Sequence, residues 1–367
     1  FLRDFRGDTV HPSTMAVLDE LGLLDDFLAR PHSELRTIGG KVGRDYVTIG
    51  DFSHLPAKTN FIAIMPQWDF LNFLSERGCG FPSFTLLMST AAESVIEERD
   101  RVVGVRASGP DGDLEIRADL TVACDGRHST IRDLLHVQPI DLGAPMDVLW
   151  FRISRDAGDP ESALGYIGAG AILVMIDRND YWQCGYVIPK GTFEEIKGHG
   201  LDELRGRVGV LAPFLGERLH EIRDWDNVKL LSVAVDRLSR WYRPGVLFIG
   251  DAAHAMSPVG GVGINLAIQD AVASANILSR VLRRGRPVRE AVLRRVQRRR
   301  EWPTKMTQSL QVFVQKRIVS RVLAGKRAPK RAPALLALLG RLPILQRIPA
   351  RIVGIGFRPE HVRLPRG

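Results

Sequence analysis

The sequence predicts an α/β fold with an added antiparallel layer and a helical C-terminal segment. Two short apolar runs, 120–124 and 246–250, have the length and composition of buried strands, and an aspartate follows each. Residues 147–189 contain stretches of alternating apolar and polar side chains, which is typical of antiparallel strands with one covered face. After Ile264 the apolar positions take on helical spacing and the sequence becomes strongly basic.

The N-terminal third combines helix and strand patterns. Residues 12–29 carry apolar side chains at three-residue steps, so we expect one helix there. The apolar run 84–88 is expected to form a strand. Residues 102–107 and 114–116 are expected to form a hairpin around Asp111-Gly112.

The remaining elements are mainly helical. We expect a helix over 192–208, a strand over 228–235 and a long helix from about Ile264. Small residues recur every four positions in that last helix and would permit close packing on a sheet: Ala267, Ala271 and Ala275. Basic helices are expected over 287–324, followed by an Arg-rich tail interrupted by prolines.

The composition is that of a globular protein in a reducing compartment. The chain has 367 residues, of which 45% are hydrophobic and 25% charged. Three widely spaced cysteines form no C-x-x-C pair, so neither a disulfide framework nor a zinc site is expected. No apolar run reaches the roughly 18 residues of a membrane span, and no signal pattern opens the sequence, so we expect a cytoplasmic location.

The net charge of +9 is concentrated at one end of the sequence. From Arg280 onward there are 24 Lys and Arg against 3 Asp and Glu, whereas the preceding residues carry 27 basic and 39 acidic side chains. Such a segment could contact nucleic acid or an anionic lipid surface. No nucleic-acid-binding motif accompanies it, so we expect a solvated helical surface without a nucleic-acid partner, and peripheral membrane contact stays open.

The segment most specific for chemistry is Ile249–His254, followed by the glycines of residues 258–263. Asp251 lies at the end of a strand where open α/β sheets hold ligands, and its carboxylate can accept hydrogen bonds from polyol hydroxyls. The glycines let backbone N–H groups approach a flat or anionic ligand, and the helix start adds unpaired donors. The plain alternative is a tight turn, and we expect His254 to be a structural residue of that turn.

A second segment follows the other buried strand. Asp125 ends that strand, Gly126 permits a turn, and Ser129 can cap the next helix. Arg127 and Arg132 could neutralise phosphates. A capped helix start with solvated arginines explains the same residues equally well.

Together the two segments resemble the paired motifs of class A flavin-dependent monooxygenases, the para-hydroxybenzoate hydroxylase-like FAD-dependent aromatic hydroxylases. The resemblance implies that Asp125 and Gly126 lie near the FAD pyrophosphate and the NAD(P)H route. It also implies that Asp251 binds the ribityl hydroxyls of FAD. The loop residues that would line the isoalloxazine are Pro258, Gly260, Gly261, Gly263 and Asn265.

Two further polar residues fit this resemblance at looser spacing. Arg6 is similar to an arginine that the family places against the cofactor, and Gln67 is similar to a polar residue that contacts the flavin side chain. An ordinary surface position is the alternative for both. The family's opening strand, G-x-G-x-x-G motif and helix, which seat the ADP pyrophosphate, have no counterpart after Phe1, so we expect this chain to lack that first βαβ unit by truncation.

The resemblance divides the chain into four parts. Residues 1–146 would form an FAD-binding, three-layer Rossmann-like domain without its glycine-rich unit, interleaved with some substrate-domain strands. Residues 147–240 would form a mainly antiparallel substrate domain. Residues 241–284 would return to the FAD-binding domain, and 285–367 would form a basic helical C-terminal segment.

The activity implied by the resemblance is hydroxylation of an aromatic or polycyclic small molecule. FAD would be the cofactor, NADPH or NADH the reductant and O₂ a substrate, with a flavin C4a-hydroperoxide transferring oxygen. No side-chain nucleophile or metal is required, so we assign no catalytic residue. The open alternatives are a flavin-dependent reductase or halogenase on the same scaffold, or a non-catalytic remnant; the Trp-x-Trp-x-Ile segment of such halogenases is absent.

Overall fold

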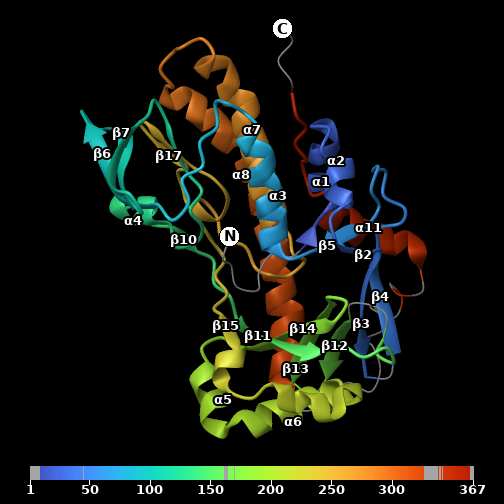
Figure 1. Cartoon of the computed structure of the whole chain (residues 1–367). Helices are drawn as coiled ribbons and strands as arrows, with labels where there is room; N and C mark the ends of the chain where they lie inside the picture. Colours follow the sequence, from blue (N-terminus) through green and yellow to red (C-terminus); the bar gives the residue numbers. More distant parts are fainter. Residues whose placement is uncertain are drawn as a thin grey trace.

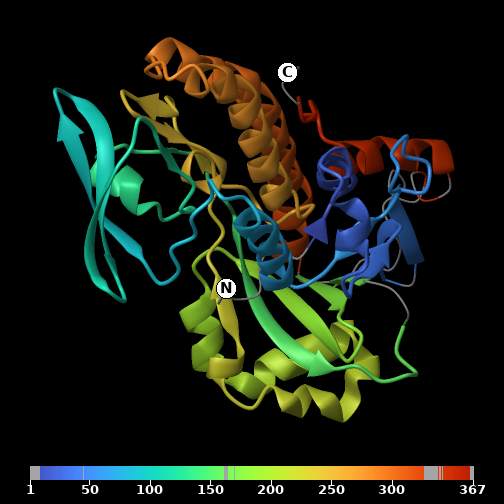
Figure 2. The ribbon, with the colours of Figure 1, turned by 45° about the horizontal axis from the view of Figure 1, so that its top comes forward.

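The described residues of this computed structural model form several small sheets crossed by two long helices (Figures 1 and 2). The structure describes residues 9–43, 45–160, 164–168, 170–325, 338, 340 and 342–363. In both views the seven-stranded sheet and its covering helices lie at one end, and the long helices run from there to the other end. Most of the candidate site residues follow the strands Thr121–Ala123 and Val246–Phe248 or stand at the start of the first long helix.

The two apolar runs form strands, as predicted, and these strands pair in parallel. Strand β9 (Thr121–Ala123) pairs in parallel with β18 (Val246–Phe248), and β17 (Tyr242–Arg243) adds an antiparallel strand to the outer side of β18. All three residues of β18 are fully buried. Because β9 and β18 run in the same direction, Asp125 and Asp251 follow strand ends at the same edge of the sheet.

An antiparallel meander stands beside this pair. It consists of β6 (Ala91–Glu98), β7 (Arg101–Gly109) and β8 (Gly112–Arg117), so the predicted hairpin is confirmed. The short helix α4 (Thr130–Leu134) packs against β6.

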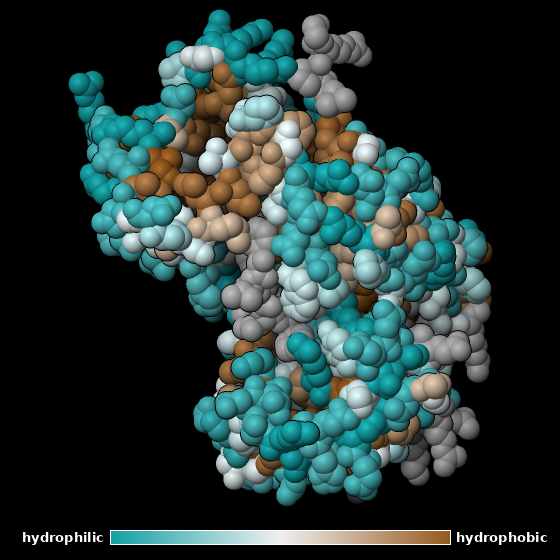
Figure 3. Space-filling view, viewed as in Figure 1, coloured by the Kyte–Doolittle hydropathy of each residue, from teal (hydrophilic) through white to brown (hydrophobic). Residues whose placement is uncertain are grey.

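The predicted strand at 84–88 is wrong, because these residues form no strand. A strand needs a neighbour for its backbone hydrogen bonds, and no described segment pairs with this one. Instead its large apolar side chains are exposed, and Figure 3 shows hydrophobic surface gathered in the hollow between the meander and α3. The exposed residues of this region are Phe81, Phe84, Leu86, Leu87, Met88 and, on β9, Val122.

The predicted antiparallel layer is confirmed and is larger than expected. In order across the sheet, its seven strands are β15 (Lys229–Leu231), β11 (Met146–Ser154), β14 (Tyr181–Pro189), β13 (Ala171–Asp177), β12 (Leu164–Gly168), β3 (Thr37–Val42) and β4 (Asp45–Asp51). Only the β12–β3 pair is parallel. Residues 37–51 therefore cross from the N-terminal region into this sheet.

Helices cover one face of the seven-stranded sheet (Figure 2). They are α5 (Phe193–His199), α6 (Leu201–Leu211) and a 3-10 segment, Pro213–Glu221. The single helix expected over 192–208 is interrupted at Gly200, whose φ of +92° is not helical. The predicted strand at 228–235 is confirmed only as β15, and residues 236–237 form β16 (Asp236–Arg237) against β10 (Ile140–Asp141).

The N-terminal segments form a third layer around a small sheet. This sheet has the order β1 (Thr9–Val10), β5 (Ile62–Ile64), β2 (Ser33–Leu35), and its helices are α1 (Pro12–Glu20), α2 (Leu24–Leu28) and α3 (Gln67–Cys79). The expected single helix over 12–29 is two helices, because Gly22, at φ +71°, ends α1.

Long helices complete the molecule as predicted. They are α7 (Gly263–Leu282), α8 (Glu290–Val314) with its continuation through a π turn (Gln315–Val319) into α9 (Ser320–Ala324), and α11 (Pro343–Gly354). Ala267 packs against Gly250, but Ala271 and Ala275 are exposed, so the expected small-residue contact with a sheet holds only at the start of α7. None of the described helices is both long and apolar enough to cross a membrane.

Candidate active site

The aspartate segment after β18 forms a tight 3-10 turn, Gly250–Ala252. Gly250 takes a φ of +57°, and a Cβ at this position would lie 3.0 Å from Ala267 Cβ on α7. Its backbone N–H donates to Asp270 Oδ2 at 3.1 Å, so the turn is fixed to α7. Asp251 is half-buried in this turn, at the strand end where the sequence predicts it.

A chain of buried charges lies behind the turn. His254 Nε2 lies 2.6 Å from Asp270 Oδ2, and Arg300 Nε donates to Asp270 Oδ1 at 2.9 Å. Burial raises the pKa of Asp270, but the contacts with His254 and Arg300 outweigh burial and hold its pKa below the usual value. The His254 ring is thus buried and in contact with the carboxylate that also holds the turn through Gly250.

The glycine-rich loop joins this turn to α7 in a shape that glycine permits. Gly260 and Gly261 have φ values of +83° and +62°. A Cβ on Gly261 would lie only 2.5 Å from Thr9 Oγ1, which itself donates to the Gly261 carbonyl at 2.9 Å. Gly263 opens a 20-residue helix, whose first N–H groups have no intrahelical acceptor. The loop is therefore a backbone cradle held close to β1.

Asn265 connects that cradle to the N-terminal layer. Its Oδ1 accepts from the His11 backbone N–H at 2.9 Å and from Thr14 Oγ1 at 2.7 Å. Its Nδ2 donates to the carbonyls of Thr9 and Gly261, both at 3.2 Å. The amide thus makes four hydrogen bonds within the protein, and through them Asn265 holds the loop against the N-terminal layer.

Three buried glutamines, two on α8 and one at the start of the following π turn, support the loop from the other side and were not predicted from the sequence. Gln311 Nε2 donates to the carbonyls of Ser257 and Val259, each at 2.9 Å. Gln308 Nε2 donates to the Ala255 carbonyl at 3.0 Å, and Gln315 Nε2 donates to Ser257 Oγ at 2.6 Å. Their spacing of three and four residues on a helix is the signal that could have predicted a shared buried face.

His11 is a fully buried ionisable residue whose backbone is hydrogen-bonded to Asn265 beside the cradle. It precedes α1, with Nδ1 2.7 Å from the Val353 carbonyl oxygen of α11. Burial lowers the pKa of His11 to about 4, while the hydrogen bond to Val353 acts in the opposite direction. Since Nδ1 must donate to a carbonyl, the neutral ring presents an Nε2 lone pair, and Nε2 has no hydrogen-bond partner among the described residues.

The residues that follow β9 cap the start of α4, and one of them also contacts the turn after β18. Asp125 Oδ2 accepts from the Ile131 N–H at 3.2 Å, and Ser129 Oγ accepts from the Arg132 N–H at 3.1 Å, as expected for a helix start. Gly126 has a φ of +92°. Arg132 is buried and donates to the carbonyls of Arg127 and Ala252, so it joins the two motifs. The guanidinium of Arg132 is therefore buried on protein carbonyls, and it is neither solvated nor exposed for a phosphate.

Comparison with known proteins identifies the family. The family description "FAD binding domain" matches residues 1–309. The chain belongs to this family. It is an FAD-dependent oxidoreductase of the monooxygenase class, similar to the para-hydroxybenzoate hydroxylase-like enzymes.

Individual relatives agree with this family. A 6-methylpretetramide 4-monooxygenase from Streptomyces rimosus is 32% identical over 95% of this chain and 83% of that enzyme. A para-nitrophenol 4-monooxygenase from a Pseudomonas strain is 25% identical over 75% of this chain and 68% of its own length. The crystal structure of pqsL, a probable FAD-dependent monooxygenase from Pseudomonas aeruginosa, has the same fold, with a TM-score of 0.72, 22% identity and coverage of 88% of this chain and 90% of that one.

The residues of this FAD-binding family member fit a flavin at the loop. The glycine cradle packs so closely on Thr9 that Gly261 has no room for a Cβ, and the half-buried Asp251 stands at the adjoining turn. Gln67 is the first residue of α3, directly after the segment leaving β5, which pairs with β1 beside the loop. Arg6 lies outside the described residues.

Proposed function

We propose that this enzyme hydroxylates an aromatic or polycyclic small molecule, with FAD as cofactor, NADH or NADPH as reductant and O₂ as the oxygen source. The observation that carries the proposal is the junction of Asp251 with the glycine cradle at the start of α7. Bound FAD would supply the redox and oxygen-activating chemistry, which no amino-acid side chain can supply. The protein's contribution is binding, orientation and exclusion of water.

Each part of the junction has a task in this proposal. Asp251 would accept hydrogen bonds from the ribityl hydroxyls. The backbone N–H groups of Gly260 and Gly263 would face the electron-rich edge of the isoalloxazine ring, which Gly261 and Asn265 would also line, and the α7 start favours negative charge there. Pro258, whose carbonyl accepts from the Gly261 N–H at 3.0 Å, would fix the entry to the loop.

The remaining predicted residues would act at the edges of this site. Asp125 and Gly126 would position the motif near the FAD pyrophosphate, through the α4 cap that Asp125 already makes. Gln67 and Arg6 would contact the cofactor from the N-terminal layer. We assign the FAD-binding domain to residues 1–146 and 241–284, the substrate domain to 147–240 and a C-terminal segment to 285–367.

The outer edge of β9 supports one more part of the proposal. Within the described residues β9 pairs only with β18, and Val122 on it is 39% exposed; most of the apolar side chains of segment 84–88 are exposed as well. An exposed edge with apolar neighbours is a template for another strand. We propose that a glycine-rich βαβ unit, which this sequence does not contain, adds there and seats the ADP part of FAD.

The three cysteines suit a cytoplasmic enzyme in this proposal. Cys79, Cys124 and Cys184 are all free thiols. Burial raises the pKa of Cys184 well above its usual value, so that thiol is unreactive.

The first test is the visible absorbance of purified protein, made from residue Phe1 onward and from the full reading frame. Flavin in the longer product and little in the shorter one is expected. Asp251→Ala in the longer product should lose most of its flavin while keeping its circular dichroism spectrum, and Asp113→Ala, an exposed carboxylate on β8, should lose none. Stoichiometric FAD in the Asp251→Ala protein would contradict the ribityl assignment.

Activity is tested separately, by oxidation of NADH and NADPH with phenolic and polycyclic aromatic substrates. Substrate-stimulated oxidation with an added hydroxyl on the product, detected by mass spectrometry, is the expected result. Flavin binding without any hydroxylated product would instead favour the reductase alternative.

A further inference from the structure

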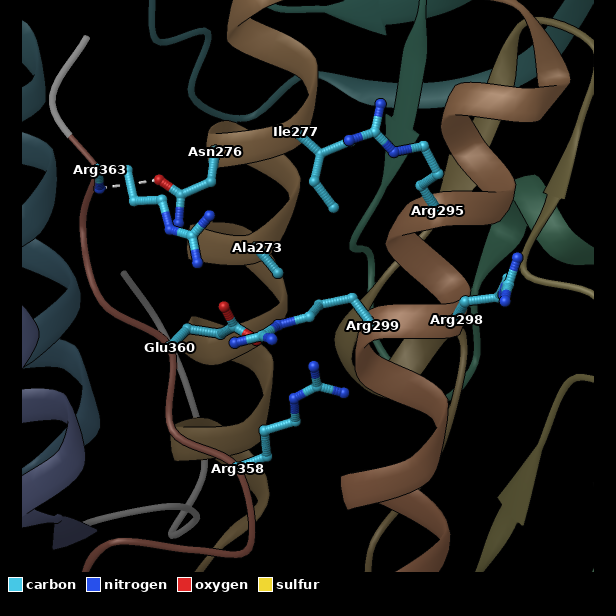
Figure 4. Close-up of a pocket in the computed structure, with 9 residues that line it drawn as sticks. All are labelled: Ala273, Asn276, Ile277, Arg295, Arg298, Arg299, Arg358, Glu360 and Arg363. Carbon is cyan, nitrogen blue, oxygen red and sulfur yellow. Dashed lines mark hydrogen bonds and ion pairs between the residues drawn. The ribbon is translucent and has the colours of Figure 1, made fainter. Parts of the chain in front are cut away.

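A pocket lined by arginines lies between α7, α8 and the C-terminal segment (Figure 4). Its volume is about 360 Å³, within the range of small-ligand pockets. Ala273 on its floor follows Asn265 by eight residues, or about 12 Å along the helix axis. Its lining residues come from α7 (Ala273, Asn276, Ile277), from α8 (Arg295, Arg298, Arg299) and from the C-terminal segment (Arg358, Glu360, Arg363).

The pocket has a large excess of positive charge. Its only carboxylate is Glu360, which is buried and already pairs with Arg299 at 2.5 Å and with Arg300 behind the wall at 3.5 Å. The side chains of the four other lining arginines form no hydrogen bond or ion pair with any described residue; these are Arg295, Arg298, Arg358 and Arg363. Figure 4 shows Arg358 and Arg363 turned into the space above α7, whereas Arg298 points away from it.

The backbone that carries these arginines is firmly held. Asn276 Oδ1 accepts from the Arg363 N–H at 2.9 Å, and Asn276 Nδ2 donates to the His361 carbonyl at 2.8 Å. The Arg358 carbonyl accepts from Arg300 Nη1 at 3.1 Å, and the Glu360 N–H donates to Gln269 Oε1. The C-terminal wall is therefore held at both ends, and Figure 4 shows Glu360 between the side chains of Arg358 and Arg363.

We propose that this pocket binds a small anion that carries two linked phosphate groups. Guanidinium groups match phosphate oxygens in paired hydrogen bonds, and these come from opposite walls, Arg295 on α8 and Arg358 and Arg363 on the C-terminal segment. A single phosphate would leave part of this charge unpaired, whereas a diphosphate offers oxygens to both walls. An uncharged aromatic molecule would gain little, because Ala273 and Ile277 are the only apolar side chains of the lining.

The test is calorimetric titration of the purified protein with pyrophosphate at about physiological salt, where weak surface attraction is screened. Saturable one-to-one binding is expected. The double variant Arg358→Gln/Arg363→Gln should bind at least about tenfold more weakly, because it loses two charge-assisted contacts. The matched control is Arg283→Gln/Arg284→Gln, which removes the same charge from exposed positions at the end of α7 and should bind like the original protein.

Several results would overturn the proposal. These are absence of pyrophosphate binding, equal weakening by both double variants, or tighter binding of inorganic phosphate than of pyrophosphate. Binding only to vesicles of phosphatidylglycerol, lost in Arg358→Gln/Arg363→Gln, would assign the pocket to a lipid headgroup instead. Flavin content should be the same in both double variants. A negative result for pyrophosphate binding can therefore be told apart from a negative result for the proposed FAD-dependent function.

Discussion

His11 makes the stability of the molecule depend on pH in a defined direction. Its pKa is about 4 in the folded protein against 6.5 in the unfolded chain. The unfolded chain therefore binds the proton first, and the stability from neutral His11 is complete above about pH 6.5 and falls as the pH decreases toward 4. Between pH 7 and pH 5 this single group should cost about 2 kcal/mol of unfolding free energy.

Urea unfolding of the original protein and of His11→Asn at both pH values isolates this contribution. The asparagine amide can still donate to the Val353 carbonyl but cannot titrate. The variant should lose about 2 kcal/mol less than the original between pH 7 and pH 5. Equal losses in the two proteins would show that His11 is not protonated on unfolding.

Single residues were predicted from sequence where local geometry alone decides them. Ser129 as a cap and Gly126 as a turn residue depend only on their own backbone, and both are found. Arg132 and Asn265 depend on partners more than a hundred residues away, so neither the inward guanidinium nor the fully used amide was visible in the sequence. A polar side chain in a motif can support the site from behind as readily as it can face the ligand.

The glycine-rich loop allows strain and crowding to be separated within one element. Gly260 and Gly261 both have positive φ, but only at Gly261 would a Cβ meet a close neighbour, Thr9 Oγ1. Gly261→Ala should therefore reduce flavin content more than Gly260→Ala, since both variants carry the conformational cost and only one carries the clash. Flavin absorbance per protein and thermal unfolding of the two variants provide the measurement. A larger effect at Gly260 would mean that the cradle is not held against β1.

The C-terminal segment is predicted to depend on one buried carboxylate. Glu360 pairs with Arg299 and with the buried Arg300, so Glu360→Gln leaves Arg299 without its carboxylate and Arg300 with Asp270 alone. We expect a loss of about 2–4 kcal/mol in the free energy of unfolding, measured with urea. The control Glu301→Gln removes an exposed helical ion pair with Lys305 and should cost under about 0.5 kcal/mol. A loss as small as that of the control would show that the segment docks without this pair.

Helices and strands were predicted best where they need no distant partner. The long helices and the hairpin of residues 101–117 agree with their sequence patterns. The segment 84–88 has a strand's composition but no neighbouring strand, and the helices at 12–29 and 192–208 were each divided by a single glycine in a positive-φ turn. Composition indicates which secondary structure a segment favours, whereas a pairing strand or a single backbone angle decides which one it forms.

At the scale of the whole molecule, the sequence patterns did not predict the order of strands in the sheets. The exposed edge of β9 is a consequence of that order. The strands at 37–51 join the seven-stranded sheet through one parallel pairing with β12, which no local pattern indicates. By contrast, β9 and β18 as separate strands were predicted from two apolar runs, each of which is followed by an aspartate. Among the strands that the structure describes, none pairs with the other side of β9.

That edge predicts how the 367-residue chain behaves by itself. Val122 and the apolar side chains of 84–88 should draw copies together as protein concentration rises, because an open strand edge with apolar neighbours lowers its free energy by pairing. Val122→Lys should reduce this association, since a lysine on an edge strand opposes further pairing. The control Val210→Lys on α6 makes the same change at a more exposed residue, since Val210 is 69% exposed and Val122 39%. This control should leave the association unaltered. Sedimentation velocity over a concentration series distinguishes them, and a monomer at every concentration would show that this edge is already covered.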